Sequence, residues 1–121
     1  MSQVLTTALT KLEVQQVSFM GPAVYMHVAF QNRGTKAIAG VKGTAIVRDM
    51  FGDTLATRPV SYDKGIPLNG IKELRDILST SFDQGGRKLA TTPIEKVKFS
   101  FEPSIIIFDD GTKLEAPAID R

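Results

Sequence analysis

One stretch decides the fold class: Val24-Tyr25-Met26-His27-Val28-Ala29-Phe30. Val24 and every second residue after it are large and apolar, so their side chains share one face of an extended chain. Tyr25 and His27 fall on the opposite face. This period of two predicts a half-buried antiparallel strand that packs its inner face on a core.

Turn signals divide the rest of the chain into short extended segments. Asn32-Arg33-Gly34-Thr35 follows the first stretch, and Met50-Phe51-Gly52-Asp53 and Asp109-Asp110-Gly111-Thr112 come later. Asn, Asp and Gly favour tight turns. Besides 24–30, we expect strands over about 9–19, 38–48, 54–61, 97–101, 105–108 and 112–116. This pattern is typical of an all-β, two-sheet immunoglobulin-like sandwich of about seven strands, and one such domain accounts for residues 1–121.

The first expected strand changes the parity of its apolar residues. Leu12 and Val14 share one parity, whereas Val17 and Phe19 share the other. A one-residue bulge near Gln15-Gln16 would keep all four on the core side, because an extra residue reverses the alternation.

The last two expected strands differ in their predicted position in the sheet: one is internal and the other lies at the edge. Ile105-Ile106-Ile107-Phe108 is continuously apolar, which is typical of a strand that is covered on both faces and internal to its sheet. Pro103 ends the alternating segment 97–101, and we expect that segment to lie beside 104–108. The Asp-Gly turn then brings Thr112–Glu115 against the other side, at the edge of the sheet.

One segment fits two structures. The apolar residues of 71–82 are spaced as on one helix face, and Asn69 before and Gly85-Gly86 after it are typical helix-end residues. The residues from Leu74 onward also keep strand parity, and Ser79-Thr80-Ser81 are poor helix formers. We favour a short helix over about 71–78, with a strand as the alternative.

Composition excludes several classes of site. The 121 residues include no Cys and a single His, so disulfides, thiolate metal sites and cysteine nucleophiles are excluded. Fifteen basic against thirteen acidic residues leave a net charge of +2, without the clustered basic face that nucleic acids require. No glycine motif for nucleotides occurs. We expect a protein that is not an enzyme, with no cofactor, no metal and no nucleic-acid partner.

The sequence leaves two locations open. No apolar run approaches the roughly 20 residues that cross a bilayer, so we expect no membrane span. Residues 1–10 lack the basic and apolar regions of a signal peptide. The sequence as it stands predicts a cytoplasmic protein. If a leader peptide has been removed, an exported or envelope-associated location is the alternative.

Acidic residues gather in the expected turns. Asp49 and Asp53 lie at one turn, and Asp109-Asp110 opens another. A calcium site would need about six to eight oxygens, and no calcium-loop motif occurs. Asp is also a common turn residue, because its side chain bonds to the backbone of its own turn. We therefore expect these residues to stabilise turns and not to hold a metal.

Three residues are candidates for contact with a partner. Tyr25 and His27 lie on the outward face of their strand, where His27 could form a pH-sensitive or ligand-contacting patch. Phe51 stands at a turn tip, where an exposed ring would anchor a partner. The alternatives are that His27 is a half-covered strand residue and that Phe51 folds back over the end of the sandwich.

Four stretches carry a resemblance to known domains: Val28-Ala-Phe-Gln-Asn32, Gly40-Val-Lys-Gly43, Val47-Arg-Asp-Met-Phe-Gly-Asp53 and Ile107-Phe-Asp-Asp-Gly-Thr112. The chain resembles, over about residues 12–115, bacterial immunoglobulin-like or fibronectin-III-like sandwich domains related to the FxLYD and late-embryogenesis-abundant (water-stress) groups. The resemblance implies a non-catalytic domain, often attached to a lipoprotein or cell-surface protein. It also implies an aromatic residue at the Phe51 turn and a strand over 71–82.

The function we expect is that of a non-enzymatic accessory module that binds another protein through its end loops or an exposed strand edge. The alternative is a structural subunit of a larger assembly, such as a homo-oligomer or a phage or envelope component. A small enzyme or a carbohydrate-binding domain is a third hypothesis. A carbohydrate-binding surface would need exposed Trp or Tyr side chains, and the chain has no Trp and two Tyr.

Overall fold

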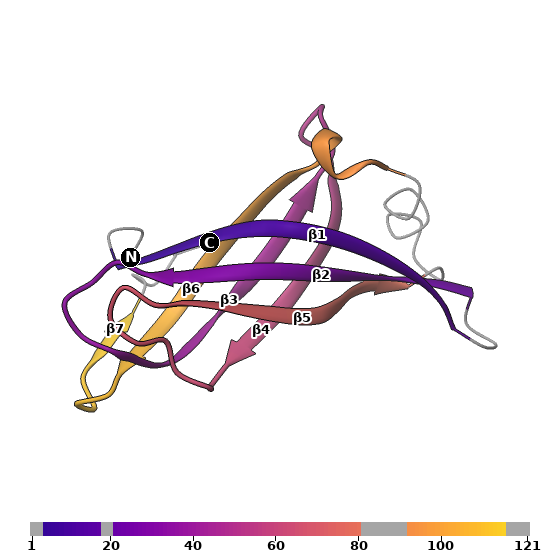
Figure 1. Ribbon diagram of the computed structural model, residues 1–121. Coiled ribbons are helices and arrows are strands. Elements are labelled where there is room, and N and C mark those ends of the chain that lie inside the picture. The colour runs from indigo at the N-terminus through magenta and orange to yellow at the C-terminus, as the bar shows by residue number, and fades with distance from the viewer. Residues whose placement is uncertain (1–3, 18–20, 81–91, 116–121) are drawn as a thin grey trace.

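The computed structural model describes residues 4–17, 21–80 and 92–115. These residues form two antiparallel sheets that pack face to face as a β-sandwich (Figure 1). The strands in chain order are β1 (Leu5–Val17), β2 (Gly21–Asn32), β3 (Ile38–Arg48), β4 (Thr54–Tyr62), β5 (Ile71–Thr80), β6 (Lys98–Phe108) and β7 (Lys113–Glu115). One 3-10 turn, η1 (Ile94–Lys96), precedes β6. The predicted all-β, two-sheet sandwich of about seven strands is confirmed.

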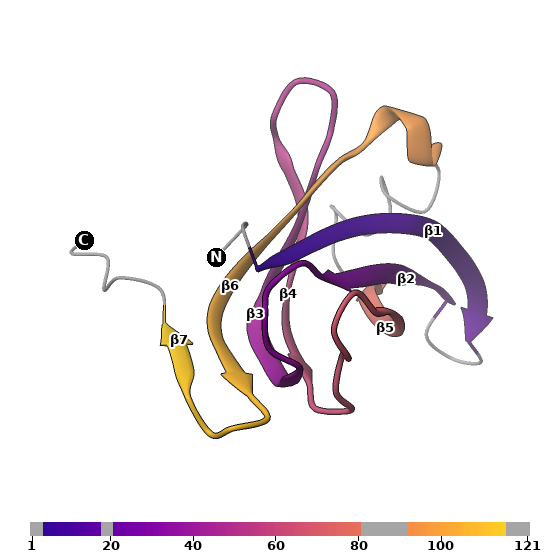
Figure 2. The same ribbon diagram turned by 60° about the vertical axis from the view of Figure 1, so that its left-hand side comes forward.

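The two sheets contain three and four strands. Their orders are β1-β2-β5 and β4-β3-β6-β7. The hairpins β1–β2, β3–β4 and β6–β7 each stay within one sheet, and the other connections cross between the sheets. Figure 2 shows the two layers from another side. In immunoglobulin constant domains the fourth strand belongs to the sheet of the first, second and fifth. Here β4 pairs with β3 instead.

The inner row of β2 forms the centre of the core. Val24, Met26, Val28 and Phe30 are each at most 1% exposed, which confirms the alternation predicted for this stretch. The Phe30 ring contacts the rings of Tyr62 from β4 and Phe101 from β6, each with a centroid distance of 5.5 Å. The Phe101 contact is edge-to-face, a geometry that aromatic pairs favour. One ring therefore joins the three-stranded sheet to two strands of the other sheet.

Gly43 of β3 provides the space that Phe101 occupies. A Cβ atom added at Gly43 would lie 2.6 Å from Cζ of Phe101 and 2.5 Å from the carbonyl oxygen of Glu102. Contacts this short with a packed ring and with backbone require the neighbouring strand to move. The aromatic packing around Phe30 thus depends on Gly43, because β3 must leave room for the Phe101 ring of the neighbouring strand β6.

The end of β2 carries a buried amide. Asn32 continues the inner row and is 0% exposed. Its Nδ2 donates to the carbonyl oxygens of Lys36 and Ile66, at 2.9 and 3.1 Å. Its Oδ1 accepts from the backbone N–H of Gly34 at 2.9 Å. Because donors and acceptor are both satisfied, the amide can be buried, and it ties the β2–β3 loop to the β4–β5 loop.

The helix favoured over 71–78 is wrong, because this segment is part of strand β5. It pairs with β2 from Ile71↔Gln31 to Thr80↔Ala23. Leu74 packs against the core from the inner face, while Glu73 and Arg75 are exposed. Pairing with the central strand supplies the backbone hydrogen bonds that a helix would have formed internally, and it overrides the local helical spacing. Phe82 and Gly85-Gly86 lie outside the described residues.

The bulge in β1 lies at another position than predicted. The register with β2 shifts between Leu9 and Lys11, so Thr10 is the extra residue, and pairing is regular across Gln15-Gln16. The Thr10 hydroxyl lies 3.0 Å from the His27 carbonyl oxygen, which gives the bulge a hydrogen bond of its own. The shift lets Leu9 and Leu12 both pack on the core.

Strand β6 runs through Pro103, where the sequence predicted a break. Segments 97–101 and 104–108 therefore do not lie side by side, and both parts of β6 pair with β3. The register shifts between Lys42 and Gly43 of β3, so that Ser104 is an extra residue beside Pro103. A bulge is one of the few places where a sheet accepts proline. The Ser104 hydroxyl donates to the Lys42 carbonyl oxygen at 3.1 Å.

The closing hairpin partly matches its prediction. Residues 105–107 are internal, between β3 and the edge strand β7, as expected. The expected cover on both faces is wrong, because Ile106 is 0% exposed on the inner side while Ile107 is 37% exposed on the outer side. The alternation in 97–101 predicts that Val97, Phe99 and Phe101 are buried, and the structure shows them partly buried and packed against the core.

The packing at Gly43 gives the first prediction. We expect Gly43→Ala to lower the free energy of unfolding by about 1–3 kcal/mol, because the added methyl group overpacks the contact with Phe101. Gly40→Ala on the same strand is the matched control, since its Cβ would come no closer than 3.4 Å to the Tyr62 carbonyl oxygen. Urea denaturation measures both changes. Equal losses in the two variants would contradict the packing assigned to Phe101.

Candidate functional site

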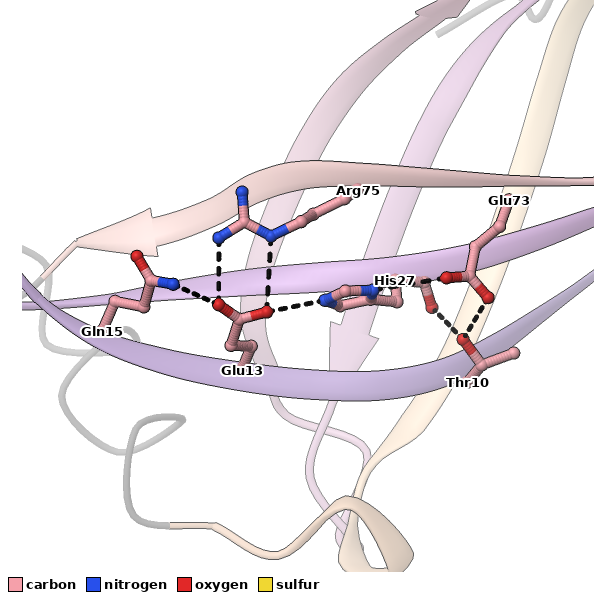
Figure 3. A network of polar contacts seen from close by, with 6 residues as sticks. All are labelled: Thr10, Glu13, Gln15, His27, Glu73 and Arg75. Carbon is pink, nitrogen blue, oxygen red and sulfur yellow. Dashed lines mark hydrogen bonds and ion pairs between the residues drawn. The ribbon is translucent and has the colours of Figure 1, made fainter.

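Two of the three candidate residues lie on the outer face of the three-stranded sheet. Because β2 is the central strand, Tyr25 and His27 stand between the side chains of β1 and β5. Glu13 comes from β1, and Glu73 and Arg75 come from β5 (Figure 3). The sheet register places these residues in a polar network across all three strands.

His27 lies between two carboxylates. Its Nε2 is 2.9 Å from Oε1 of Glu13, and its Nδ1 is 3.4 Å from Oε1 of Glu73. The imidazole is 15% exposed. The Thr10 hydroxyl lies 3.3 Å from Oε2 of Glu73, so the bulge of β1 also adjoins the network (Figure 3). His27 therefore links the two outer strands through the central one.

Glu13 is the most heavily contacted acid of the network. Arg75 donates to its carboxylate from Nη2 at 3.0 Å and from Nε at 3.3 Å, a forked geometry that favours the ionised acid. Gln15 donates to the same carboxylate. The hydrogen bonds from Arg75, and then the one with His27, lower the pKa of Glu13 from 4.5 to about 2. The bond to Glu13 in turn raises the pKa of Arg75 above its ordinary value.

The aromatic candidate on this face is covered by the same arginine. The guanidinium of Arg75 lies 4.0 Å from the centroid of the Tyr25 ring, within the range of a cation–π contact. Tyr25 and His27 thus both contact side chains of neighbouring strands. The arrangement can hold β1, β2 and β5 together, and its charged groups are directed at one another.

The third candidate, Phe51, lies in the turn between β3 and β4. Phe51 is 82% exposed and Met50 beside it is 58% exposed, so the alternative that Phe51 folds back over the sandwich is wrong. We call residues 50–52 the turn tip. Its last residue, Gly52, has φ +90°, a conformation that favours glycine.

Asp49 holds the turn tip in place. It is 4% exposed, and its Oδ1 accepts from the backbone N–H groups of Phe51 at 2.9 Å and Asp53 at 3.0 Å. The backbone N–H of Asp49 also donates to the carbonyl oxygen of Asp53 at 2.9 Å. This carboxylate stabilises a turn, as the sequence predicted for the acidic residues.

The second acidic turn is built in the same way. Oδ1 of Asp110 accepts from the backbone N–H of Thr112 at 3.0 Å and from its hydroxyl, and its Oδ2 lies 3.0 Å from Nζ of Lys36. The bonds from Thr112, and then that from Lys36, lower the pKa of Asp110 to about 2. Across residues 4–17, 21–80 and 92–115, no group of three or more His, Asp or Glu side chains is arranged to hold a metal ion.

The structure does not bring the three candidates together. Tyr25 and His27 belong to β2 of one sheet, whereas Phe51 lies in the turn between β3 and β4 of the other sheet. Figure 1 shows β2 and this turn in different layers. Sequence reasoning missed Glu13, Glu73 and Arg75 as neighbours of His27. Reading 71–80 as a strand would have placed Glu73 and Arg75 on one face, but their pairing with His27 depends on the register.

In comparisons with known proteins, no family model, no curated protein and no solved structure matches the chain. Its class is therefore the one that its fold defines, an all-β sandwich of two antiparallel sheets. The part of the chain that the structure describes contains no helix long and apolar enough to cross a membrane.

The lowered pKa of Glu13 gives the second prediction. An acid whose pKa falls on folding stabilises the fold fully above its unfolded pKa, here about 4.5, and loses this contribution as the pH falls toward 2. We expect Glu13→Gln to flatten the decline of the unfolding free energy between about pH 4.5 and pH 2.

Urea denaturation at several pH values over this range measures the effect. Glu95→Gln is the control, because Glu95 is an exposed glutamate of η1. The same pH dependence in Glu13→Gln as in the unchanged chain would contradict the role given to the Glu13 carboxylate.

Proposed function

We propose that the chain is a non-enzymatic binding module that contacts another protein through its turn tip. The observation that carries this proposal is the 82% exposure of Phe51 on a turn whose backbone is fixed by the Asp49 carboxylate. Phenylalanine and methionine are both enriched in protein interfaces, so Phe51 and Met50, exposed side by side at this turn, form a suitable contact surface.

The energetic argument favours an insertion of the Phe51 ring into a pocket. Burying a phenylalanine side chain fully contributes about 1.5–3 kcal/mol, and the neighbouring Met50 adds further apolar surface. Because Asp49 already orders the turn, little conformational entropy is lost when the turn tip binds. A fixed turn with an exposed ring is therefore a suitable anchor for a partner.

A non-enzymatic role is supported by how the polar residues are used. The carboxylates of Glu13, Asp49 and Asp110 all accept hydrogen bonds from neighbouring groups, so these three acids are engaged within the fold. Tyr25 and His27 remain predicted partner contacts. In our proposal they mainly hold the three-stranded sheet together, because Arg75, Glu13 and Glu73 engage them.

We assign the domain to the fibronectin-III-like type of sandwich. The placement of β4 beside β3 supports this assignment, since it separates the chain from the immunoglobulin constant arrangement. The strand at 71–80, which the resemblance implied, supports it as well. Modules of this kind present loops and turns at the ends of a stable sandwich.

Site-specific photocrosslinking tests the proposal. We expect p-benzoylphenylalanine in place of Phe51 to give a discrete protein adduct in cells that produce the chain, because the side chain at 51 is buried in the complex. The same residue at the exposed position Lys11, on the other sheet, is the control and should give none. Absence of an adduct specific to position 51 would contradict the proposed function.

A further inference from the structure

The outer face of the four-stranded sheet has a hollow of about 290 Å³. We call it the Gly40 hollow, because Gly40 of β3 has no side chain where it lies beside Ile107 of β6 and the carbonyl oxygen of Tyr62 of β4. The side chains around it include Lys42, Ser61, Asp63, Ile105 and Ile107. Ile107 is 37% exposed, so this hollow is the place where the apolar run of β6 lacks cover.

We infer that the Gly40 hollow of one copy receives the Phe51 ring of a second copy of this chain. The inference rests on the proposed function and names the partner. A cavity of about 150 Å³ lined by apolar side chains is enough to hold benzene in other proteins. A hollow of about 290 Å³ whose lining includes Ile105 and Ile107 therefore has room for a phenyl ring.

One charge at the hollow can pair with a charge beside the turn tip. Lys42 and Asp63 are both exposed at the hollow, and Asp53 is exposed directly after the turn tip. Within the described ranges neither Lys42 nor Asp53 has an ion-pair partner in its own copy. When the ring of one copy enters the hollow of another, the Asp53 carboxylate can approach the Lys42 ammonium group. Paired charges at the rim of an interface select the partner and its orientation.

The positions of the two surfaces exclude an intramolecular contact. The hollow lies at Gly40 and Asp63, the open end of the β3–β4 hairpin, and the turn tip lies at its closed end. Figures 1 and 2 show that the two ends of this hairpin are far apart. About eight strand residues separate Lys42 from Met50, or roughly 26 Å at 3.3 Å per residue. Different surfaces thus meet in a head-to-tail contact, which builds open chains or rings and not two-fold dimers.

Sedimentation velocity of the whole chain tests this arrangement. We expect concentration-dependent dimers and longer species below about 1 mM. Phe51→Ser removes the ring, and Gly40→Val fills the hollow with a side chain that suits a strand. Each change should weaken association at least about tenfold, the effect of losing one apolar anchor. Leu68→Ser, which removes another exposed apolar side chain, is the control and should change nothing.

Mixing the two variants distinguishes a head-to-tail contact from other interfaces. Phe51→Ser keeps the hollow, and Gly40→Val keeps the ring, so an equimolar mixture should form one-to-one dimers and nothing longer. At the concentration where the mixture dimerises, each variant alone should be largely monomeric, because its association is at least about tenfold weaker. Loss of association in Asp53→Lys, and its recovery in a mixture with Lys42→Glu, would support the ion pair. Circular dichroism shows whether a variant is folded. If Gly40→Val is unfolded, Phe51→Ser alone tests the contact, and the reverse also holds.

The outcomes separate this inference from the proposed function. A chain that stays monomeric at every concentration, or an association that neither Phe51→Ser nor Gly40→Val weakens, overturns the inference. In that case, an adduct between position 51 and a different protein would still support the proposed function. An adduct between position 51 and a peptide of this chain that contains Ile105 or Ile107 supports both.

Discussion

The contact of the Phe30 ring with both Tyr62 and Phe101 determines how one sheet lies over the other. Phe30 belongs to β2, the central strand of its sheet, whereas its two partners come from β4 and β6 on either side of β3. Gly43 leaves the space that Phe101 needs. Because β3 lies between the two strands that contact Phe30, the hairpin that carries Phe51 is part of the same packing unit.

Local alternation was enough to predict the strands whose sequence has a clear period of two. Met26, Val28 and Phe30 are buried as expected, and β3 has the predicted bounds. Features that depend on pairing could not be predicted in this way. The spacing in 71–78 suits a helix, and only the hydrogen bonds with β2 make it a strand. The bulge at Thr10 likewise depends on a bond to the His27 carbonyl oxygen.

The candidate site also contains features that depend on strand pairing and could not be predicted from local sequence. The outward direction of Tyr25 and His27 follows from the sequence, but their contacts with Glu13 and Arg75 require the register of three strands. The exposure of Phe51 depends on Asp49, whose carboxylate turns back to the backbone of the turn. The outer face of the three-stranded sheet is therefore occupied by its own polar network. The turn tip and the Gly40 hollow expose apolar surface, which in our proposal a second molecule covers.

The most direct test of this account is amide hydrogen exchange at the turn tip. If Asp49 fixes the turn, the amides of Phe51 and Asp53 exchange more slowly than those of an unstructured peptide. Asp49→Ala should remove this protection while the core amides of β2 keep theirs. Exchange of both turn amides at the unstructured rate in the unchanged chain would contradict a preorganised Phe51 anchor.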